Sequence, residues 1–148
     1  MKNRKAVIIA TVVIAIVATI IISLPAILQA AGLHPHYAGA SYQLSGKRAL
    51  IVTTSHGILG DSGKPTGVYA SEMTVPYYEF LDAGMTVDIA SIGGGKIPIE
   101  PMSLKWPLTT KADKRFLADP VYKGMVASSV RIDDVDFASY DLVYLAGG

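Results

Sequence analysis

The first hydrophobic pattern in the chain is continuous and covers residues 6–28, which read AVIIATVVIAIVATIIISLPAIL. Three residues with small hydroxyl side chains interrupt this run, and such side chains can hydrogen-bond to carbonyl groups of their own helix. A helix of this length extends about 34 Å, which is enough to cross a hydrocarbon core of about 30 Å. In lipid every backbone polar group must be satisfied within the segment, so we predict one transmembrane helix here in spite of the many β-branched residues.

The residues around this run predict its orientation. Residues 1–5, MKNRK, are cationic, and no charged residue follows the run until Lys47. By the positive-inside rule the N-terminus is then cytoplasmic, and the rest of the chain is extracytoplasmic. A cleaved signal segment is the alternative, because LQAAGL resembles a cleavage site, and the protein would then be secreted. Signal peptides have an apolar region of about 7–15 residues, so this longer run fits an uncleaved anchor better.

Residues 29–46 contain several Gly, Ser and Ala residues, and we predict a linker between the membrane segment and a domain that begins at residue 47. His34 and His36 in this linker have a spacing that invites a metal hypothesis. Pro35 between them and the lack of a nearby third ligand argue against it. We therefore predict no metal ligands and no cofactor.

From residue 47 to residue 148, short apolar runs alternate with segments of helical periodicity. Apolar runs rich in β-branched residues are typical of strands buried on both faces of a parallel sheet. The order β-α-β-α-β predicts an α/β fold. The predicted strands are Arg48–Thr54, Met85–Ser91 and the final YDLVYLAGG; the predicted helices are Glu72–Ala83, Lys111–Leu117 and, less regularly, Val121–Ser128.

Two helix starts have local signals. Thr110 can cap the helix that begins at residue 111, with Asp113 in its first turn near the positive end of the helix dipole. Pro76 complicates the preceding helix, because proline is tolerated in a first turn but not in a helix interior. Either Thr74 is the N-cap and Pro76 lies in the first turn, or the helix begins at Ser71 and Pro76 kinks it.

Charge and composition exclude several classes of function. All 12 acidic residues lie after residue 60, and from residue 47 onward ten basic residues accompany them, so the domain is slightly acidic. A basic patch for a phosphate backbone is not visible, and nucleic-acid binding is not predicted. The chain has no cysteine, which excludes disulfides, thiolate metal sites and a cysteine nucleophile within these residues.

Ligands of parallel sheets bind beyond the carboxyl ends of the strands, where the loops after residues 54 and 91 and the terminal AGG lie. Glycines in HGILGDSG are spaced G-x-x-G-x-x-G rather than G-x-G-x-x-G, so turns explain them as well as a nucleotide site does. Glu72 in PTGVYASEMTVPYYEFLDAG lies at or near a helix start beside these loops. A glutamate in a first turn can simply stabilise the helix, by about 0.3–1 kcal/mol.

A wider set of motifs gives Glu72 a second interpretation. ALIVTTS, then TGVYASEMTVPYYEFLDAGMTVDIASIGGGKIPIEPMS, then YDLVYLAGG closely resembles the ThiJ/PfpI superfamily over about residues 47–148. The resemblance implies the class I glutamine amidotransferase-like, flavodoxin-type fold, a parallel sheet with helices on both faces. Within the superfamily it is nearest to the branch described as glutathione-independent glyoxalase III, protein deglycase and holding chaperone.

The resemblance also implies roles for two residues. Glu72 matches a glutamate that hydrogen-bonds the sulfur of a reactive cysteine and can shuttle a proton. Gly148 matches a glycine whose backbone N–H helps to bind an oxyanion. The family's cysteine and histidine follow later, so the chain resembles the first half of the domain. A truncated gene product, a split gene or a piece of a longer protein would each explain this.

Three classes of function follow from the resemblance. The first is a lineage acting on small reactive aldehydes such as methylglyoxal, for which this chain by itself should be inactive. The second is a holding chaperone or binding module for unfolded clients. The third is an amidohydrolase or peptidase relative. The membrane, through residues 6–28, and a second copy in a homodimer are further expected partners. The family members of this branch are mostly cytosolic, whereas this chain has a predicted anchor.

Overall fold

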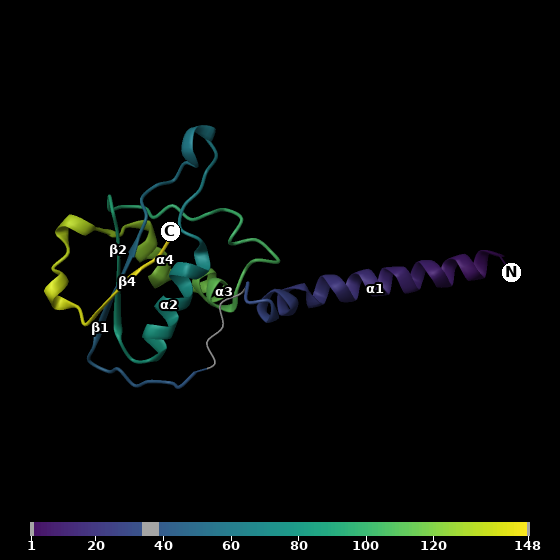
Figure 1. The fold of residues 1–148 in the computed structure, drawn as a ribbon, viewed down its shortest axis with the longest axis horizontal. Coiled ribbons are helices and arrows are strands. Elements are labelled where there is room, and N and C mark those ends of the chain that lie inside the picture. Colours follow the sequence, from purple (N-terminus) through teal and green to yellow (C-terminus); the bar gives the residue numbers. More distant parts are fainter. Residues whose placement is uncertain (1, 34–38, 148) are drawn as a thin grey trace. The chain divides into compact units, whose positions relative to one another are not determined.

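The computed structural model describes residues 2–33 and 39–147 and divides the chain into two compact units, Met1–His36 and Tyr37–Gly148. The described part of the first unit is the helix α1, Lys2–Ala30, followed by a short turn. The described part of the second unit, called the C-terminal unit below, contains a sheet, three α-helices and three short 3₁₀ helices (Figure 1).

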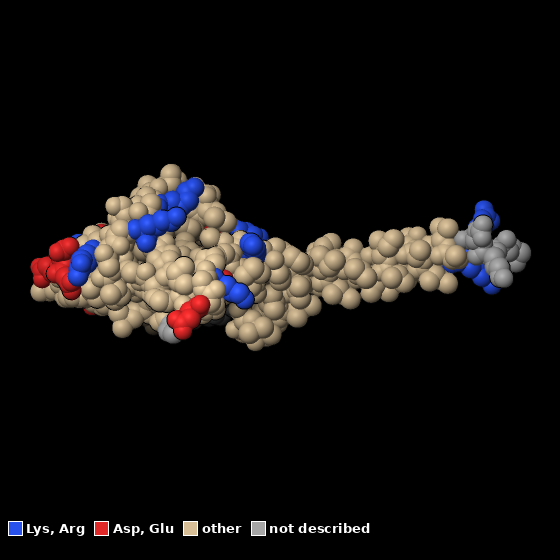
Figure 2. Space-filling model, turned by 90° about the horizontal axis from the view of Figure 1, so that it is seen from above, with Lys and Arg blue, Asp and Glu red and all other residues tan. Residues whose placement is uncertain are grey.

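Helix α1 has the features of a candidate membrane span, by its length and composition between Arg4 and Ala30. Signal sequences near an N-terminus share these features, so the helix is compatible with either use. The hydroxyls of Thr11, Thr19 and Ser23 donate to carbonyls three or four residues earlier, as the sequence predicted for hydroxyls in an apolar helix. Figure 2 shows an uncharged helix surface beyond the basic N-terminal end.

The sheet has four parallel strands in the order β3-β2-β1-β4. The central strand β1, Arg48–Thr53, pairs with β2, Thr86–Ser91, on one side and with β4, Leu142–Leu145, on the other. These three strands confirm the predicted α/β fold with a parallel sheet. The short edge strand β3, Val130–Arg131, was not predicted; both of its residues are exposed, so no apolar pattern marks it.

The α-helices of the C-terminal unit are α2, Ala70–Asp82, α3, Lys111–Ala118, and α4, Pro120–Ala127. Helix α3 begins after Thr110 as predicted, with a capping box between Thr110 and Asp113. The interpretation of Thr74 as the N-cap of α2 is wrong, because the helix begins at Ala70 and Pro76 lies inside it. Thr74 instead turns its buried hydroxyl toward α3.

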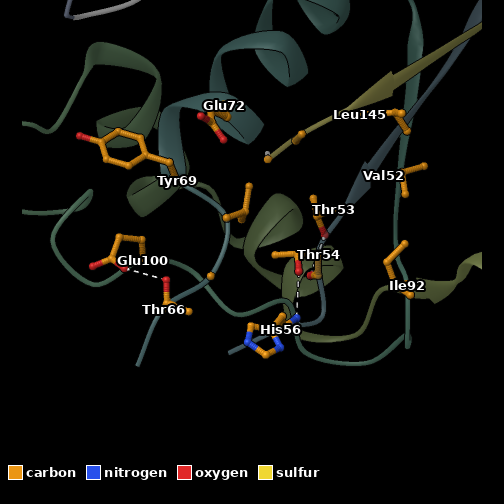
Figure 3. A pocket seen from close by; sticks show the side chains of 14 residues that line it. Val52, Thr53, Thr54, His56, Thr66, Tyr69, Glu72, Ile92, Glu100 and Leu145 are labelled. Atoms are coloured by element: carbon orange, nitrogen blue, oxygen red, sulfur yellow. Dashed lines mark hydrogen bonds between the residues drawn. The ribbon is translucent and has the colours of Figure 1, made fainter. Parts of the chain in front are cut away.

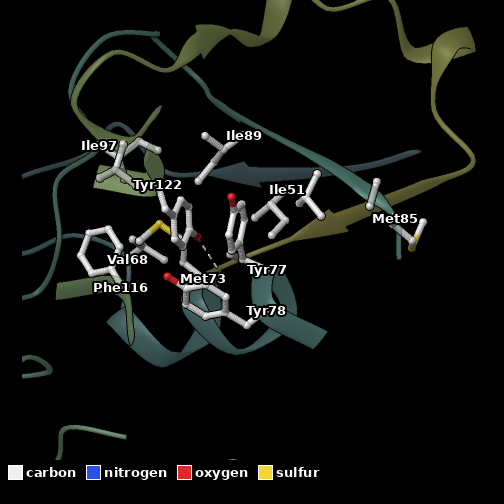
Figure 4. Packing of buried hydrophobic residues seen from close by; sticks show 14 residues of the cluster. Ile51, Val68, Met73, Tyr77, Tyr78, Met85, Ile89, Ile97, Phe116 and Tyr122 are labelled. Carbon is white, nitrogen blue, oxygen red and sulfur yellow. Dashed lines mark hydrogen bonds between the residues drawn. The ribbon is translucent and has the colours of Figure 1, made fainter. Parts of the chain in front are cut away.

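Helices α2, α3 and α4 pack on the same face of the sheet, where the larger core lies (Figure 4). Tyr77 and Tyr122 stack there with ring centroids 3.5 Å apart, and the hydroxyl of Tyr122 donates to the carbonyl of Met73 at 3.1 Å. The core on the opposite face is smaller. The segment that contains the 3₁₀ helices Ile132–Asp134 and Phe137–Ser139 covers it. Within the described chain, 3₁₀ turns therefore stand where α-helices were expected on the second face.

Candidate functional site

A cleft of about 720 Å³ lies at the carboxyl ends of β1 and β4, where the α/β fold predicts ligand binding (Figure 3). Its lining comes from the ends of these strands, from the loop before α2, from the first turn of α2 and from the segment after β2. The lining residues are Val52, Thr53, Thr54, His56, Thr66, Gly67, Val68, Tyr69, Glu72, Ile92, Glu100, Leu145, Ala146 and Gly147.

The loop between β1 and α2 forms one rim of the cleft. An antiparallel bridge between Ile58 and Pro65 closes its tip, and Gly63 has a φ of 68° at the turn. Gly63 therefore serves a turn, as one of the two interpretations that the sequence left open would have it. Closer to the sheet, the backbone N–H of His56 donates to the Thr54 hydroxyl at 2.9 Å, and the exposed His56 lines the cleft.

Glu72 is the third residue of α2 and its side chain is exposed. Its backbone N–H donates to the carbonyl of Tyr69 at 3.0 Å, which completes the first turn of the helix. The Glu72 carboxylate makes no hydrogen bond or ion pair with any residue that the structure describes. In Figure 3 it extends from the start of α2 toward the space at the end of β4. The carboxylate is thus free to meet a ligand in the cleft.

Two further polar side chains line the cleft near Glu72. Glu100 accepts a hydrogen bond from the Thr66 hydroxyl at 3.1 Å and another from the backbone N–H of Met102 at 3.2 Å. Burial raises the pKa of the Tyr69 hydroxyl, and the negative charges of Asp113, Glu72 and Glu100 raise this pKa further. Tyr69 therefore stays protonated at neutral pH and can donate a hydrogen bond to an oxygen of a ligand.

The cleft contains one of the two predicted site residues, together with polar residues that were not predicted. Glu72 lines the cleft, whereas Gly148 lies outside the described residues. Its neighbour Gly147 lines the cleft with a φ of 99°, a conformation that favours glycine. Tyr69 and Glu100, which come from separate loops, were not predicted as site residues. For Glu100 the available signal was an acidic residue in the loop after the second predicted strand.

Among residues 2–33 and 39–147, the structure places no group of three or more His, Asp or Glu side chains where it could hold a metal ion. His34 and His36, which were considered as metal ligands, lie outside the described residues. The arrangement in the cleft suits chemistry by hydrogen bonding and proton transfer, because its polar groups are carboxylates, a phenol and an imidazole.

Solved structures similar to this chain support the fold and its family. The X-ray structure of Francisella tularensis Rapid Encystment Protein 24 KDa (REP24), a ThiJ/PfpI-family protein, is 40% identical to the chain with a TM-score of 0.62, over 68% of this chain and 44% of that one. The crystal structure of glyoxalase III from Candida albicans has 23% identity and a TM-score of 0.57, over 69% of this chain and 44% of that one. A further crystallographic structure has 29% identity and a TM-score of 0.53.

The REP24 structure supports the predicted resemblance to the ThiJ/PfpI superfamily over about two thirds of the chain, and glyoxalase III from Candida albicans shares the fold over a similar range. The chain spans less than half of the length of the solved structures that it matches, at 44%, 42% and 44%. Models of protein families and curated proteins, compared with the chain in the same way, gave no match.

Proposed function

We propose that this ThiJ/PfpI-like chain supplies the acid–base part of a site that converts small reactive aldehydes such as methylglyoxal without a cofactor. The observation that carries the proposal is the Glu72 carboxylate, which lies exposed in the first turn of α2, lines the cleft and has no partner among the described residues. A glutamate in a first turn can stabilise its helix without a partner, so the position of this carboxylate in the cleft is what favours a functional role.

The proposed reaction needs a thiolate, which these 148 residues do not contain because they include no cysteine. The thiolate attacks the aldehyde carbon, an S–C bond forms, and the aldehyde oxygen takes up a proton. One proton then moves from that carbon to the neighbouring carbonyl carbon, and the hydroxyl proton moves to the neighbouring carbonyl oxygen, which converts the hemithioacetal into a thioester. Water cleaves the thioester, so the thiol is released and the net reaction is 2-oxoaldehyde plus water to 2-hydroxy acid, with no external oxidant or reductant.

Within this route, Glu72 would hold and move protons beside the sulfur and the adjacent carbon, since a carboxyl group is a common general acid and base. Tyr69, which lines the cleft, would donate a hydrogen bond from its hydroxyl to a substrate oxygen. The small aldehyde would enter through the cleft of about 720 Å³.

The test is Glu72→Gln in the protein encoded by the full natural reading frame. Since general acid–base groups contribute about 10²–10⁴-fold, kcat/KM for methylglyoxal is expected to fall by about that factor. Glu79→Gln is the matched control, because Glu79 is exposed on the same helix but does not line the cleft. Methylglyoxal loss and 2-hydroxy acid formation are measured together. An active protein that is indifferent to Glu72→Gln would refute the proposed role.

A holding chaperone is the second candidate, and one observation favours it. Edge strand β4 exposes apolar side chains, with Leu145 71% and Val143 44% exposed, and Ile92 beside the cleft is 54% exposed. Exposed apolar side chains of this kind can contribute to a surface that holds other proteins. Such an activity would suppress aggregation of a heated client protein and would be unaffected by Glu72→Gln, so the same pair of variants separates the two functions.

We further propose that α1 anchors the protein in a membrane with the C-terminal unit on the extracytoplasmic side. These 148 residues contain no cysteine, so a cysteine introduced into them reports topology when its labelling is compared with that of the unsubstituted protein. Lys64→Cys, in the exposed loop after β1, is expected to react with a membrane-impermeant maleimide on intact cells, and Asn3→Cys only after lysis. The reverse labelling pattern would contradict this topology, and a mature protein lacking residue 3 would show a cleaved signal segment instead.

A further inference from the structure

The start of α2, which carries Glu72, lacks the usual side-chain cap. Its N-cap residue is Tyr69, whose side chain cannot accept a hydrogen bond from the first helical N–H groups and makes no such bond. The first N–H groups of a helix have no partner within the helix and need one elsewhere. A helix start without a cap would leave the direction of the Glu72 side chain poorly fixed.

Ser103, 33 residues after Ala70 in the sequence, supplies the missing partner. The backbone N–H of Ala70, the first residue of α2, donates to the Ser103 hydroxyl oxygen at 3.0 Å. The same hydroxyl donates to the carbonyl of Glu100 at 2.6 Å, and Ser103 is 0% exposed. The hydroxyl thus has one fixed donor and one fixed acceptor, a geometry in which it cannot rotate without losing a bond.

Ser103 is held in place by a longer contact between residues 98–103, called the strap below, and residues 66–70. The backbone N–H of Val68 donates to the carbonyl of Pro98, and the N–H of Glu100 donates back to the carbonyl of Val68, each at 3.0 Å. The bond from Thr66 to the Glu100 carboxylate lies on the same contact. The strap therefore fixes the loop that enters α2 and also delivers Glu100 to the cleft.

We propose that Ser103 is a positioning residue for Glu72: it caps α2 from the strap and so holds the first turn with the Glu72 carboxylate directed into the cleft. The inference rests on the proposed function of Glu72 for its catalytic consequence, but its structural part stands on the bonds around Ala70. Ser103 itself does not line the cleft, so its effect on the reaction would be transmitted through the helix start.

The structural part is tested by hydrogen exchange on the full chain. Ser103→Ala is expected to raise the exchange rate of the Ala70 amide about fivefold to tenfold, and Ser103→Thr, which keeps the hydroxyl, is expected to restore protection. Ser129→Ala is the matched control, because Ser129 is also buried and hydrogen-bonded but lies outside the cleft lining. Unchanged exchange at Ala70 in Ser103→Ala would overturn the inference, whatever Glu72 does.

The catalytic part is tested by kcat in the protein of the full natural reading frame. Ser103→Ala is expected to lower kcat about tenfold with little change in KM, and to have no further effect when Glu72 is already Gln, because residues that act as a unit are not additive. A full additional loss in the Glu72→Gln background would overturn the inference. If Glu72→Gln alone leaves kcat unchanged, the proposed function fails, and the exchange result alone then decides the capping role of Ser103.

Discussion

Gly67→Ala is expected to lower the free energy of unfolding of the C-terminal unit by about 3 kcal/mol, because the added methyl group has no space. A Cβ atom at Gly67 would lie 2.1 Å from the carbonyl oxygen of Pro98 and 2.6 Å from the backbone nitrogen of Ile99. Both atoms belong to the backbone of the strap, so they can move only if the strap separates from residues 66–70. Separation would break the two 3.0 Å bonds that join Val68 to Pro98 and Glu100.

The effect is measured as a shift of the urea midpoint, followed by near-ultraviolet circular dichroism of the packed tyrosines in the C-terminal unit. Gly124→Ala is the matched control, because Gly124 is exposed in the interior of α4 and a Cβ there meets nothing within 4 Å. Alanine in place of glycine inside a helix stabilises by about 0.5–1 kcal/mol. Equal midpoints for the two variants would show that the strap is not tightly packed against residues 66–70.

The parts of the fold that could be predicted from the sequence are those whose signals are local. Strands β1 and β2 produce apolar runs because they lie inside a sheet with a core on each face, and edge strand β4 has such a run although Val143 and Leu145 are exposed. Helix α3 was bounded correctly because Thr110 and Asp113 form their capping box within four residues. Local rules left the start of α2 open between Ser71, one residue from the observed start, and a later start after Thr74, because the cap comes from Ser103 in another loop. An interior Pro76 then pointed to a later start than the real one.

The same distinction applies to the candidate site. Glu72 was found through motifs that surround it in the sequence, and the carboxyl ends of the strands could be placed from the order of the elements. Glu100 and Tyr69 were missed because only the parallel contact between the strap and residues 66–70 brings them to the cleft. Such contacts between irregular segments leave no periodic pattern, so they become visible only in three dimensions.

Asp113→Ala is expected to destabilise the C-terminal unit by about 3 kcal/mol, because it removes the acceptor of three buried hydrogen bonds. Asp113 is 0% exposed; one carboxylate oxygen accepts from the Thr74 hydroxyl at 2.6 Å, and the other accepts from the backbone N–H and the hydroxyl of Thr110 at 2.7 and 2.8 Å. Thr74 is also 0% exposed, so water cannot readily replace the lost acceptor.

The urea midpoint again gives the measurement, and Asp82→Ala is the matched control. Asp82 pairs with Arg115 at 2.7 Å, but its side chain is 61% exposed, so its loss is expected to cost less than about 1 kcal/mol. Equal effects of the two substitutions would contradict the assignment of Asp113 as a buried acceptor. Asp113→Asn keeps the shape of the side chain but replaces one acceptor oxygen by a donor group, so a loss close to that of Asp113→Ala would show that the acceptors, and not the packing, join α3 to α2. The bond to Asp113 holds α2 at Thr74, two residues after Glu72, and the strap holds α2 at Ala70, two residues before Glu72. The two contacts therefore fix the helix on both sides of the residue on which the proposed chemistry depends.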